Sequence, residues 1–268
     1  MKAQLIDGKR ISAEIKAEAA EEAAALKAKG ITPCLAVVLV GDDSASQVYV
    51  NNKKKACEAV GIRSVSHVLS GGTTEEALLE LIAKLNADKD IHGILVQMPV
   101  PKQIDERKVI LAIDPKKDVD CFHPVNVGNL HTGGEGFLPC TPAGIIELIK
   151  RSGHSIEGKQ CVVIGRSNIV GKPVAMLLMQ ENGTVTICHS RTRNLAEICR
   201  GADIIVSAVG KVNTVTADMV KEGAILIDVG MNRNEAGKLC GDVDFENVKE
   251  IAGAITPVPG GVGPMTIA

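Results

Sequence analysis

The sequence predicts an α/β fold made of two α/β domains, the second of them a Rossmann-like parallel sheet. Short apolar runs typical of buried strands alternate along the chain with amphipathic stretches typical of helices. This alternation builds parallel sheets covered by helices. The 268 residues are 45% hydrophobic and 23% charged, an ordinary composition for a globular protein. A stretch rich in Gly, Pro, Asn and Asp over 114–141 interrupts the alternation and predicts a domain boundary.

The first half alternates strands with helices. The predicted strands are 34–40, 64–69 and 93–97, and the predicted helices are 12–28, 44–60 and 74–86. Thr73 and Glu76 have the spacing of a capping box at the start of the third helix. Gly61 ends the second helix, and Pro99 ends the third strand. Because 114–141 shows no sustained period, it predicts a long connection.

The second half begins with a helix that runs to Gly153, with Thr141 as its cap and Pro142 in its first turn. The strands predicted after it, separated by helical segments, are 160–164, 184–188, 203–208, 224–229 and one near 254–256. This succession is typical of a Rossmann-like unit.

Charge and cysteine usage exclude several classes of function. The formal net charge of −2 gives no field that would attract nucleic acid or an anionic membrane, so we expect a small-molecule ligand. The chain start has no apolar core and no stretch is long enough to span a membrane, so we expect a cytoplasmic protein. The eight cysteines form no C-x-x-C pair and the six histidines show no ligand spacing. Reduced, mostly buried thiols and no metal site are therefore expected.

A glycine-containing loop from Gly165 to Gly171 follows the first strand of the Rossmann-like series. Such a loop can hold a pyrophosphate, because glycine lets backbone N–H groups approach and the helix N-terminus favours an anion. The G-x5-G spacing differs from G-x-G-x-x-G, so the string alone is also compatible with a packing role. Its position in the series favours dinucleotide binding.

The end of the next strand indicates which dinucleotide binds. NAD enzymes usually place Asp or Glu there for the ribose 2′-hydroxyl. This chain has Ser190, Arg191 and Arg193 instead, and Arg166 leaves the glycine loop beside them. Because guanidinium and hydroxyl donors suit a 2′-phosphate, NADP is favoured. For Arg191 and Arg193, solvated surface charges are the alternative.

Three residues of the first half are candidates for chemistry. Tyr49, the only tyrosine, lies four residues before Lys53 in the predicted helix, so both side chains project from one face. Gln97 ends the strand 93–97 at the carboxyl edge, where open α/β sheets bind ligands. Its amide would hold the Lys53 amine. A solvated helix face for Lys53 and a strand-end cap for Gln97 are the alternatives.

Two loops carry further candidates. Asp118 and Asp120 suggest acid–base work or a cation site, although acids two apart in a loop more often cap turns. The Pro- and Gly-rich tail over 255–266 predicts a rigid loop that presents its backbone to a ligand. A purely structural turn is the alternative there.

These strings together resemble one family, the bifunctional methylenetetrahydrofolate dehydrogenase/cyclohydrolases. The resemblance spans nearly the whole chain, in the family's order, and TPVPGGVGPMT with GRSNIVGKP is its most specific part. The other strings that carry it are VGDDSASQVYVNNKKKACEAVGI, GILVQMPVP, DPKKDVDCFHPVNVGNL, LPCTPAGIIELI, TVTICHSRTRNL, ADIIVSAVG, AILIDVGMNR and GDVDF.

The resemblance implies two reactions in a cleft between the domains. Hydride transfer from 5,10-methylenetetrahydrofolate to NADP gives the methenyl cation, and addition of water opens it to 10-formyltetrahydrofolate. Lys53 would be the general acid/base, Gln97 would orient it, Tyr49 would stack along the folate and Asp120 would bond the pterin. The other implied contacts are Pro257, Gly260, Gly261 and Pro264 for the substrate, and Gly165, Arg166, Ser167, Ser190 and Met231 for NADP.

The resemblance also implies a homodimer and a division of the chain. A catalytic domain over 1–120, a connection over 121–140 and an NADP domain over 141–260 are expected, with 261–268 returning towards the catalytic domain. The chain departs from the family at Cys121, where glycine is usual, and ends at Ala268, where the family continues into a C-terminal helix. The alternatives are a member with only one of the two activities and a non-catalytic NADP-binding module, which would not need Tyr49, Lys53 and Gln97.

Overall fold

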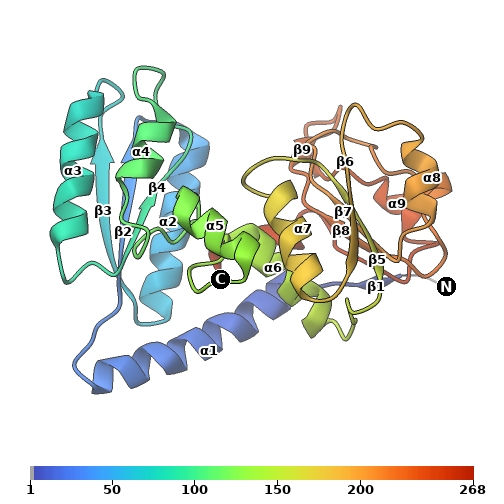
Figure 1. The fold of residues 1–268 in the computed structure, drawn as a ribbon, viewed down its shortest axis with the longest axis horizontal. Helices are drawn as coiled ribbons and strands as arrows, with labels where there is room; N and C mark the ends of the chain where they lie inside the picture. Colours follow the sequence, from blue (N-terminus) through green and yellow to red (C-terminus); the bar gives the residue numbers. More distant parts are fainter. Residues whose placement is uncertain (1–2) are drawn as a thin grey trace. The chain divides into compact units, whose positions relative to one another are not determined.

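The computed structural model describes residues 3–268 as two compact units, and its α/β fold confirms the predicted class (Figure 1). The three-stranded unit comprises Glu14–Leu138. The six-stranded unit comprises the described residues up to Ala13 together with Pro139–Thr266. The first two residues of the expected catalytic domain lie outside the described range. None of the described helices has the length and apolar content needed to cross a membrane.

The three-stranded unit contains a parallel sheet in the order β3-β2-β4. Its strands are β2 (Cys34–Val40), β3 (Arg63–Leu69) and β4 (Gly93–Val96). The central strand β2 is the apolar run CLAVVLV, and it pairs along its whole length with β3, from Cys34 to Val40. Val38 pairs with Val96, so β2 and β4 end close to one level. The predicted strands agree with these bounds to within one residue.

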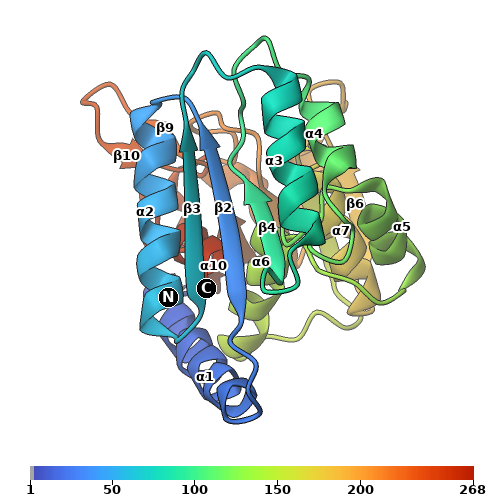
Figure 2. The same cartoon turned by 90° about the vertical axis from the view of Figure 1, so that its left-hand side faces the viewer.

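Helices cover both faces of this sheet, as Figure 2 shows for α2 and α3. Because side chains alternate along a strand, Val38 of β2 packs with α3 and α4, whereas Val37 and Leu39 pack with Val50 of α2. The helices are α1 (Gly8–Ala28), α2 (Ser44–Ala59), α3 (Glu75–Ala87), α4 (Glu106–Ala112) and α5 (Pro124–Thr132). Only part of α1 belongs to this unit, because the chain up to Ala13 belongs to the other.

Two sequence predictions in this unit were wrong. Thr74, not Thr73, caps α3, because Thr74 directly precedes the first helical residue and its Oγ1 accepts from Ala77 N at 3.2 Å. The connection predicted at 114–141 contains the helix α5. That helix starts where His123 Nδ1 accepts from Val125 N at 3.2 Å, and it buries only Asn126 and Leu130, too few for a periodic signal.

The six-stranded unit contains a parallel sheet in the order β1-β11-β8-β7-β5-β6. Its strands are β1 (Gln4–Leu5), β5 (Gln160–Ile164), β6 (Thr184–Cys188), β7 (Ile204–Ser207), β8 (Ile225–Asp228) and β11 (Ala254–Ile255). The strand β1 pairs with β11, Leu5 opposite Ile255, which is why the chain start belongs here and not with the expected catalytic domain. A hairpin of β9 (Asn232–Arg233) and β10 (Leu239–Cys240) follows β8.

Helices cover this sheet too (Figure 1). One face packs on α8 (Leu195–Arg200), the 3-10 helix η1 (Ala217–Met219) and α9 (Phe245–Val248) in a single apolar cluster. The remaining helices are α6 (Cys140–Arg151), α7 (Gly171–Gln180) and α10 (Val262–Ile267). Six of the eight cysteines of the two units are buried, as predicted.

The start of α6 also differs from its prediction. The helix begins at Cys140 with Pro139 in the cap position, and Thr141 Oγ1 lies 2.8 Å from Thr266 Oγ1 of α10. A Cβ atom at Gly144 would lie 2.7 Å from Met265 Cβ, so α10 packs closely on α6. The residues expected to return towards the catalytic domain are therefore, up to Thr266, part of the six-stranded unit.

Candidate active site

Lys53 and Gln97 meet at the carboxyl end of the three-stranded sheet. The Lys53 Nζ atom donates to Gln97 Oε1 at 3.2 Å, and both side chains are half-buried. The Gln97 amide is fixed at its other end, because Nε2 donates to the Met98 carbonyl at 2.9 Å. Its backbone N–H donates to Val38 O. The predicted contact between Lys53 and Gln97 is thus present, and the hydrogen bond to the fixed amide oxygen orients the Lys53 amine.

Tyr49 precedes Lys53 by one helical turn on α2. The helix is fixed at its start by Asp43, whose carboxylate accepts from Ser46 N at 2.8 Å. It ends at Ala59, just before Gly61, as predicted. Residues four apart lie on one face of a helix, and Tyr49 is 36% exposed. A flat ligand can therefore reach the ring on the face that carries Lys53.

The two aspartates of KKDVDC have different environments. Asp118 is buried, and its Oδ2 accepts from His123 N at 2.8 Å and Asn126 Nδ2 at 2.9 Å, so it is a structural cap for the turn before α5. Asp120 is half-buried and lies two residues after the bridge between Asp118 and Ile94 of β4. Cys121 has φ +58, the left-handed conformation that favours glycine.

The glycine loop after β5 is shaped by close backbone contacts. A Cβ atom at Gly165 would lie 2.4 Å from Ala208 O, in the loop after β7. Ser167 Oγ accepts from Val170 N at 3.2 Å and from Gly171 N at 3.1 Å, which fixes the turn into α7. In the sheet order β6-β5-β7, the strand that follows β5 along the chain lies on one side of it, and the next strand, β7, lies on the other side. The strand order therefore reverses at β5. Open α/β sheets bind ligands at such a switch point, outside the carboxyl ends of the strands.

Arg166 and Ser190 are exposed at the same level of this edge. Ile164 of β5 pairs with Cys188 of β6, and Arg166 and Ser190 each follow two residues later. The turn after β6 is held by Thr192, whose Oγ1 accepts from His189 N at 2.8 Å. Residues 188–194 include no carboxylate. The donors at this edge fit a 2′-phosphate, and glycine leaves room at the pyrophosphate position, so the residues present fit NADP.

The Pro- and Gly-rich loop belongs to the six-stranded unit. It follows β11, and a Cβ atom at Gly8 would lie 1.8 Å from Gly261 O, so the loop packs on the start of α1. Pro257, Gly260 and Pro264 are half-buried, and Gly261 is buried. Met231, predicted to contact NADP, follows β8 and is 55% exposed.

Sequence reasoning missed two buried carboxylates at the carboxyl end of β7 and β8. Asp242 is fully buried and accepts from the backbone N–H of Val209, Gly210 and Lys211. Asp228, at the end of β8, accepts from Asp242 N at 2.8 Å. Burial raises the pKa of Asp228 to about 6, even though backbone N–H groups donate to it. An Asp closing the apolar strand ILID is the signal that could have identified Asp228.

The structure thus groups the predicted residues by unit. Tyr49, Lys53, Gln97 and Asp120 lie in the three-stranded unit, and the dinucleotide and Pro/Gly-loop residues lie in the six-stranded unit. Among the described residues, no three His, Cys, Asp or Glu side chains gather in a way that could hold a metal ion.

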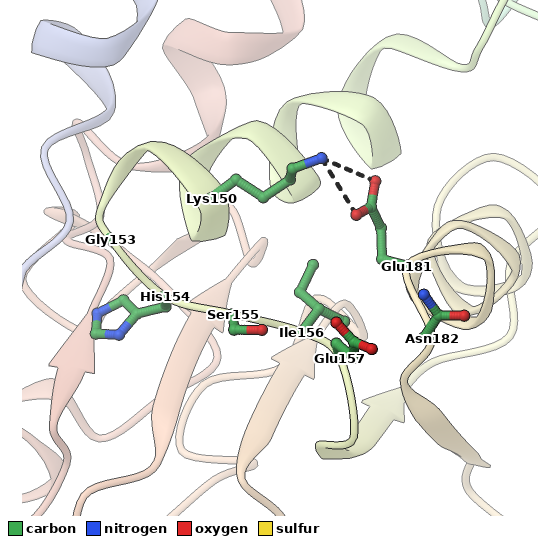
Figure 3. A pocket seen from close by; sticks show the side chains of 8 residues that line it. All are labelled: Lys150, Gly153, His154, Ser155, Ile156, Glu157, Glu181 and Asn182. Atoms are coloured by element: carbon green, nitrogen blue, oxygen red, sulfur yellow. Dashed lines mark hydrogen bonds and ion pairs between the residues drawn. The ribbon is translucent and has the colours of Figure 1, made fainter.

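A cavity of about 470 Å³ lies away from these groups (Figure 3). It is lined by residues from the end of α6 to the segment before β5 and by the end of α7. Lys150 and Glu181, which line it, form an ion pair with Nζ and Oε1 3.0 Å apart. The predicted site residues are not among the lining residues in the described chain, so this cavity is not the candidate site.

Two family models match the chain. The model for the tetrahydrofolate dehydrogenase/cyclohydrolase catalytic domain matches residues 6–120. The model for the NAD(P)-binding domain of the same family matches residues 139–268.

Known proteins similar to the chain agree with these matches. A bifunctional protein FolD from Agathobacter rectalis is 62% identical over 266 residues, which cover 99% of this chain and 95% of the relative. The crystal structure of bifunctional FolD from Campylobacter jejuni has a TM-score of 0.96 and 53% identity, covering 99% of this chain and 94% of that one. The Trypanosoma brucei methylenetetrahydrofolate dehydrogenase-cyclohydrolase, complexed with NADP and an inhibitor, has a TM-score of 0.93 and 42% identity, covering 100% and 94%.

Proposed function

The chain belongs to the tetrahydrofolate dehydrogenase/cyclohydrolase family, and from this premise we propose that it catalyses two consecutive reactions on a folate. In the first, a hydride leaves the methylene carbon of 5,10-methylenetetrahydrofolate for NADP. In the second, water adds to the resulting 5,10-methenyl cation and the ring opens to 10-formyltetrahydrofolate. The observation that carries the proposal is the contact between Lys53 Nζ and Gln97 Oε1 at 3.2 Å.

Lys53 moves protons in the second reaction. Water that attacks the methenyl carbon must lose a proton, and the ring nitrogen that leaves must gain one. A single amine can take the first and give the second, provided that it keeps one orientation. The Gln97 oxygen accepts an N–H of Lys53 in either protonation state, so the remaining positions of the nitrogen face the substrate.

The first reaction needs alignment more than proton transfer. Loss of hydride from a carbon between two nitrogens gives a delocalised cation, and NADP supplies the acceptor. Tyr49 stacks along the folate, and Asp120 accepts from the pterin. Pro257, Gly260, Gly261 and Pro264 contact the substrate through backbone and apolar surface, as the family resemblance implies.

Hydrogen-bond donors at the edge of the six-stranded sheet select NADP over NAD. We assign the 2′-phosphate to Arg166 and Ser190, which lie level with each other on neighbouring strands. Gly165 and Ser167, in the glycine loop, would hold the pyrophosphate, and Met231 would contact NADP as the family resemblance implies. The absence of an acid at 188–194 supports the choice.

One assay tests both activities. Enzyme mixed with 5,10-methylenetetrahydrofolate and NADP should produce NADPH and then 10-formyltetrahydrofolate, whereas NAD should support a slower reaction. Methenyltetrahydrofolate supplied alone should be hydrolysed without any cofactor. Turnover of only one step would assign the chain to a monofunctional member, and NADP binding without folate turnover would make it a non-catalytic module.

We also propose that the protein is a cytoplasmic homodimer: the family resemblance implies the dimer, and the lack of an apolar stretch of membrane-spanning length in the sequence favours the cytoplasm. Sedimentation velocity at micromolar concentration should give the mass of two chains. A monomer with both activities would overturn the dimer, and recovery in the membrane fraction of lysed cells would overturn the location.

A further inference from the structure

The buried carboxylate of Asp242 holds the loop that follows β7. We call residues 207–211, the last residue of β7 and the four that follow it, the β7 loop. Asp242 Oδ2 accepts from Ser207 Oγ at 3.1 Å, Val209 N at 2.8 Å and Gly210 N at 3.2 Å, and Oδ1 accepts from Lys211 N at 2.9 Å. Three successive backbone N–H groups thus converge on one carboxylate. Such an arrangement is an anion-binding nest, here occupied by a side chain of the same unit.

A second carboxylate anchors Asp242 itself. Asp228 Oδ1 accepts from Asp242 N at 2.8 Å and from Gly230 N at 3.0 Å, and Oδ2 accepts from Val243 N at 2.9 Å. Asp228 N in turn donates to Thr256 Oγ1 at 2.8 Å. The network therefore joins the β7 loop to the ends of β8 and β11, and every one of these side chains is buried.

The β7 loop forms one wall of the switch point. A Cβ atom at Gly165 would lie 2.4 Å from Ala208 O, and Ala208 N donates to Ile164 O, so the loop touches the glycine loop after β5. Val209, Gly210 and Lys211 are themselves exposed. Asn232 of β9, next to Met231, donates through Nδ2 to Asp242 Oδ1 at 2.9 Å. The same carboxylate therefore fixes both the β7 loop and the segment after β8.

We propose that Asp242 is a positioning residue for the dinucleotide: it does not touch NADP but fixes the β7 loop and the segment around Met231 against which NADP binds. The proposal deepens the assignment of NADP to this edge and rests on it. Loss of the carboxylate would free backbone N–H groups in the loop and let it move by the fraction of an ångström that binding geometry does not tolerate.

The test compares Asp242→Asn with two controls. Asp244→Asn is the matched substitution two residues further on, where the carboxylate accepts from Asn247 of α9 and not from the β7 loop. Val248→Ala removes two methyl groups from a fully buried side chain of the same unit and serves as a stability control. The dissociation constant for NADP is measured by calorimetry, the melting temperature by circular dichroism, and hydrolysis of methenyltetrahydrofolate without cofactor by absorbance.

Asp242→Asn should raise the NADP dissociation constant about 10- to 100-fold, while cofactor-free hydrolysis changes less than about twofold. Asp244→Asn should leave NADP affinity within about twofold, and Val248→Ala should lower the melting temperature without weakening NADP. Unchanged NADP affinity in a folded Asp242→Asn protein, or equal weakening in Val248→Ala, would overturn the proposal. Failure of the wild-type protein to bind NADP would instead refute the proposed function.

A milder variant decides the matter if Asp242→Asn does not fold. Ser207→Ala removes one donor to Asp242 from a fully buried position and leaves the carboxylate in place. It should weaken NADP by about three- to tenfold, which is less than the about 10- to 150-fold of a lost direct bond to a charged group, because Ser207 acts on NADP only through the position of the β7 loop. An unchanged dissociation constant in Ser207→Ala would then overturn the positioning role.

Discussion

Replacing Lys53 by methionine separates the two proposed activities. Methionine keeps much of the apolar stem and removes the amine, so the Gln97 oxygen loses its donor at 3.2 Å while α2 is retained. General acid–base catalysis contributes about 10²–10⁴-fold, and cyclohydrolase activity should fall by that factor. Dehydrogenase activity should fall less, because hydride transfer depends mainly on alignment of the two rings. Methenyltetrahydrofolate should therefore accumulate.

The hydrogen bond between Lys53 and Gln97 also predicts how much activity Gln97→Ala should lose. A hydrogen bond to a charged group contributes about 1.5–3 kcal/mol, which corresponds to a factor of about 10 to 150. If the amide acts through Lys53, this factor is the upper limit for the loss of cyclohydrolase activity in Gln97→Ala. The double variant should then be no slower than Lys53→Met alone, since coupled residues are not additive. Lys54→Met is the matched control, because Lys54 lies on the exposed side of α2 with its Nζ 4.0 Å from Glu58 Oε1.

A single time course measures both products. Enzyme, 5,10-methylenetetrahydrofolate and NADP are mixed, and NADPH and the methenyl compound are followed by absorbance until 10-formyltetrahydrofolate is formed. A parallel fall of both activities would make Lys53 a substrate-positioning residue. Retained cyclohydrolase would move the general acid/base elsewhere, with Asp120 the next candidate, and additive losses would show that Gln97 does not act through Lys53.

Three further predictions concern cofactor choice and stability. Arg166→Ala should weaken NADP binding about 10- to 150-fold, as the loss of a charged hydrogen bond does, and NAD binding much less; equal losses in calorimetry would show that Arg166 does not contact the 2′-phosphate. The φ of +58 at Cys121 costs a non-glycine residue roughly 1–2 kcal/mol. Cys121→Gly should therefore unfold at a urea concentration at least as high as Cys121→Ala does. The usual order, in which the alanine variant is more stable by about 0.4–1 kcal/mol, would contradict the strain. The raised pKa of Asp228, about 6, means that its contribution to the free energy of unfolding is complete below its unfolded pKa and is lost as pH rises through 6. The free energy of unfolding of the wild type, relative to that of Asp228→Asn, should therefore fall by roughly 1 kcal/mol from pH 5 to pH 7.5, and a constant difference would place the titration elsewhere.

The strands were the most predictable part of the fold. The predictions at 34–40, 160–164 and 184–188 coincide with β2, β5 and β6, because each strand is a run rich in β-branched residues that ends at a polar or glycine-containing turn. The short helices α4 and α5 were missed, since a helix that buries only Val109, or only Asn126 and Leu130, leaves no period in the sequence. The place of β1 beside β11 depends on pairing across the whole chain and has no local signal.

The candidate site was predictable where regular elements place its residues. Lys53 lies on a helix and Gln97 follows a strand, so their meeting at a sheet edge follows from the order of elements. The link between Asp228 and Asp242 was not predictable, because the two residues lie 14 positions apart on either side of the β9-β10 hairpin. Only the tertiary structure shows that one aspartate accepts from the backbone of the other and that the second holds the β7 loop.

Each unit contains buried cysteines whose reactivity can report its unfolding. Burial raises the pKa of Cys161 to about 11 and that of Cys199 to about 12 in the six-stranded unit. It also raises the pKa of Cys34 and Cys57 in the three-stranded unit. Since the thiolate is the form that alkylating reagents attack and all four side chains are buried, these sulfurs should react at neutral pH mainly when their unit opens. Mass spectrometry of alkylated peptides can therefore follow the opening of the two units separately in one chain without any substitution. It can also show whether a folate or NADP slows the alkylation of the cysteines in one unit or in both.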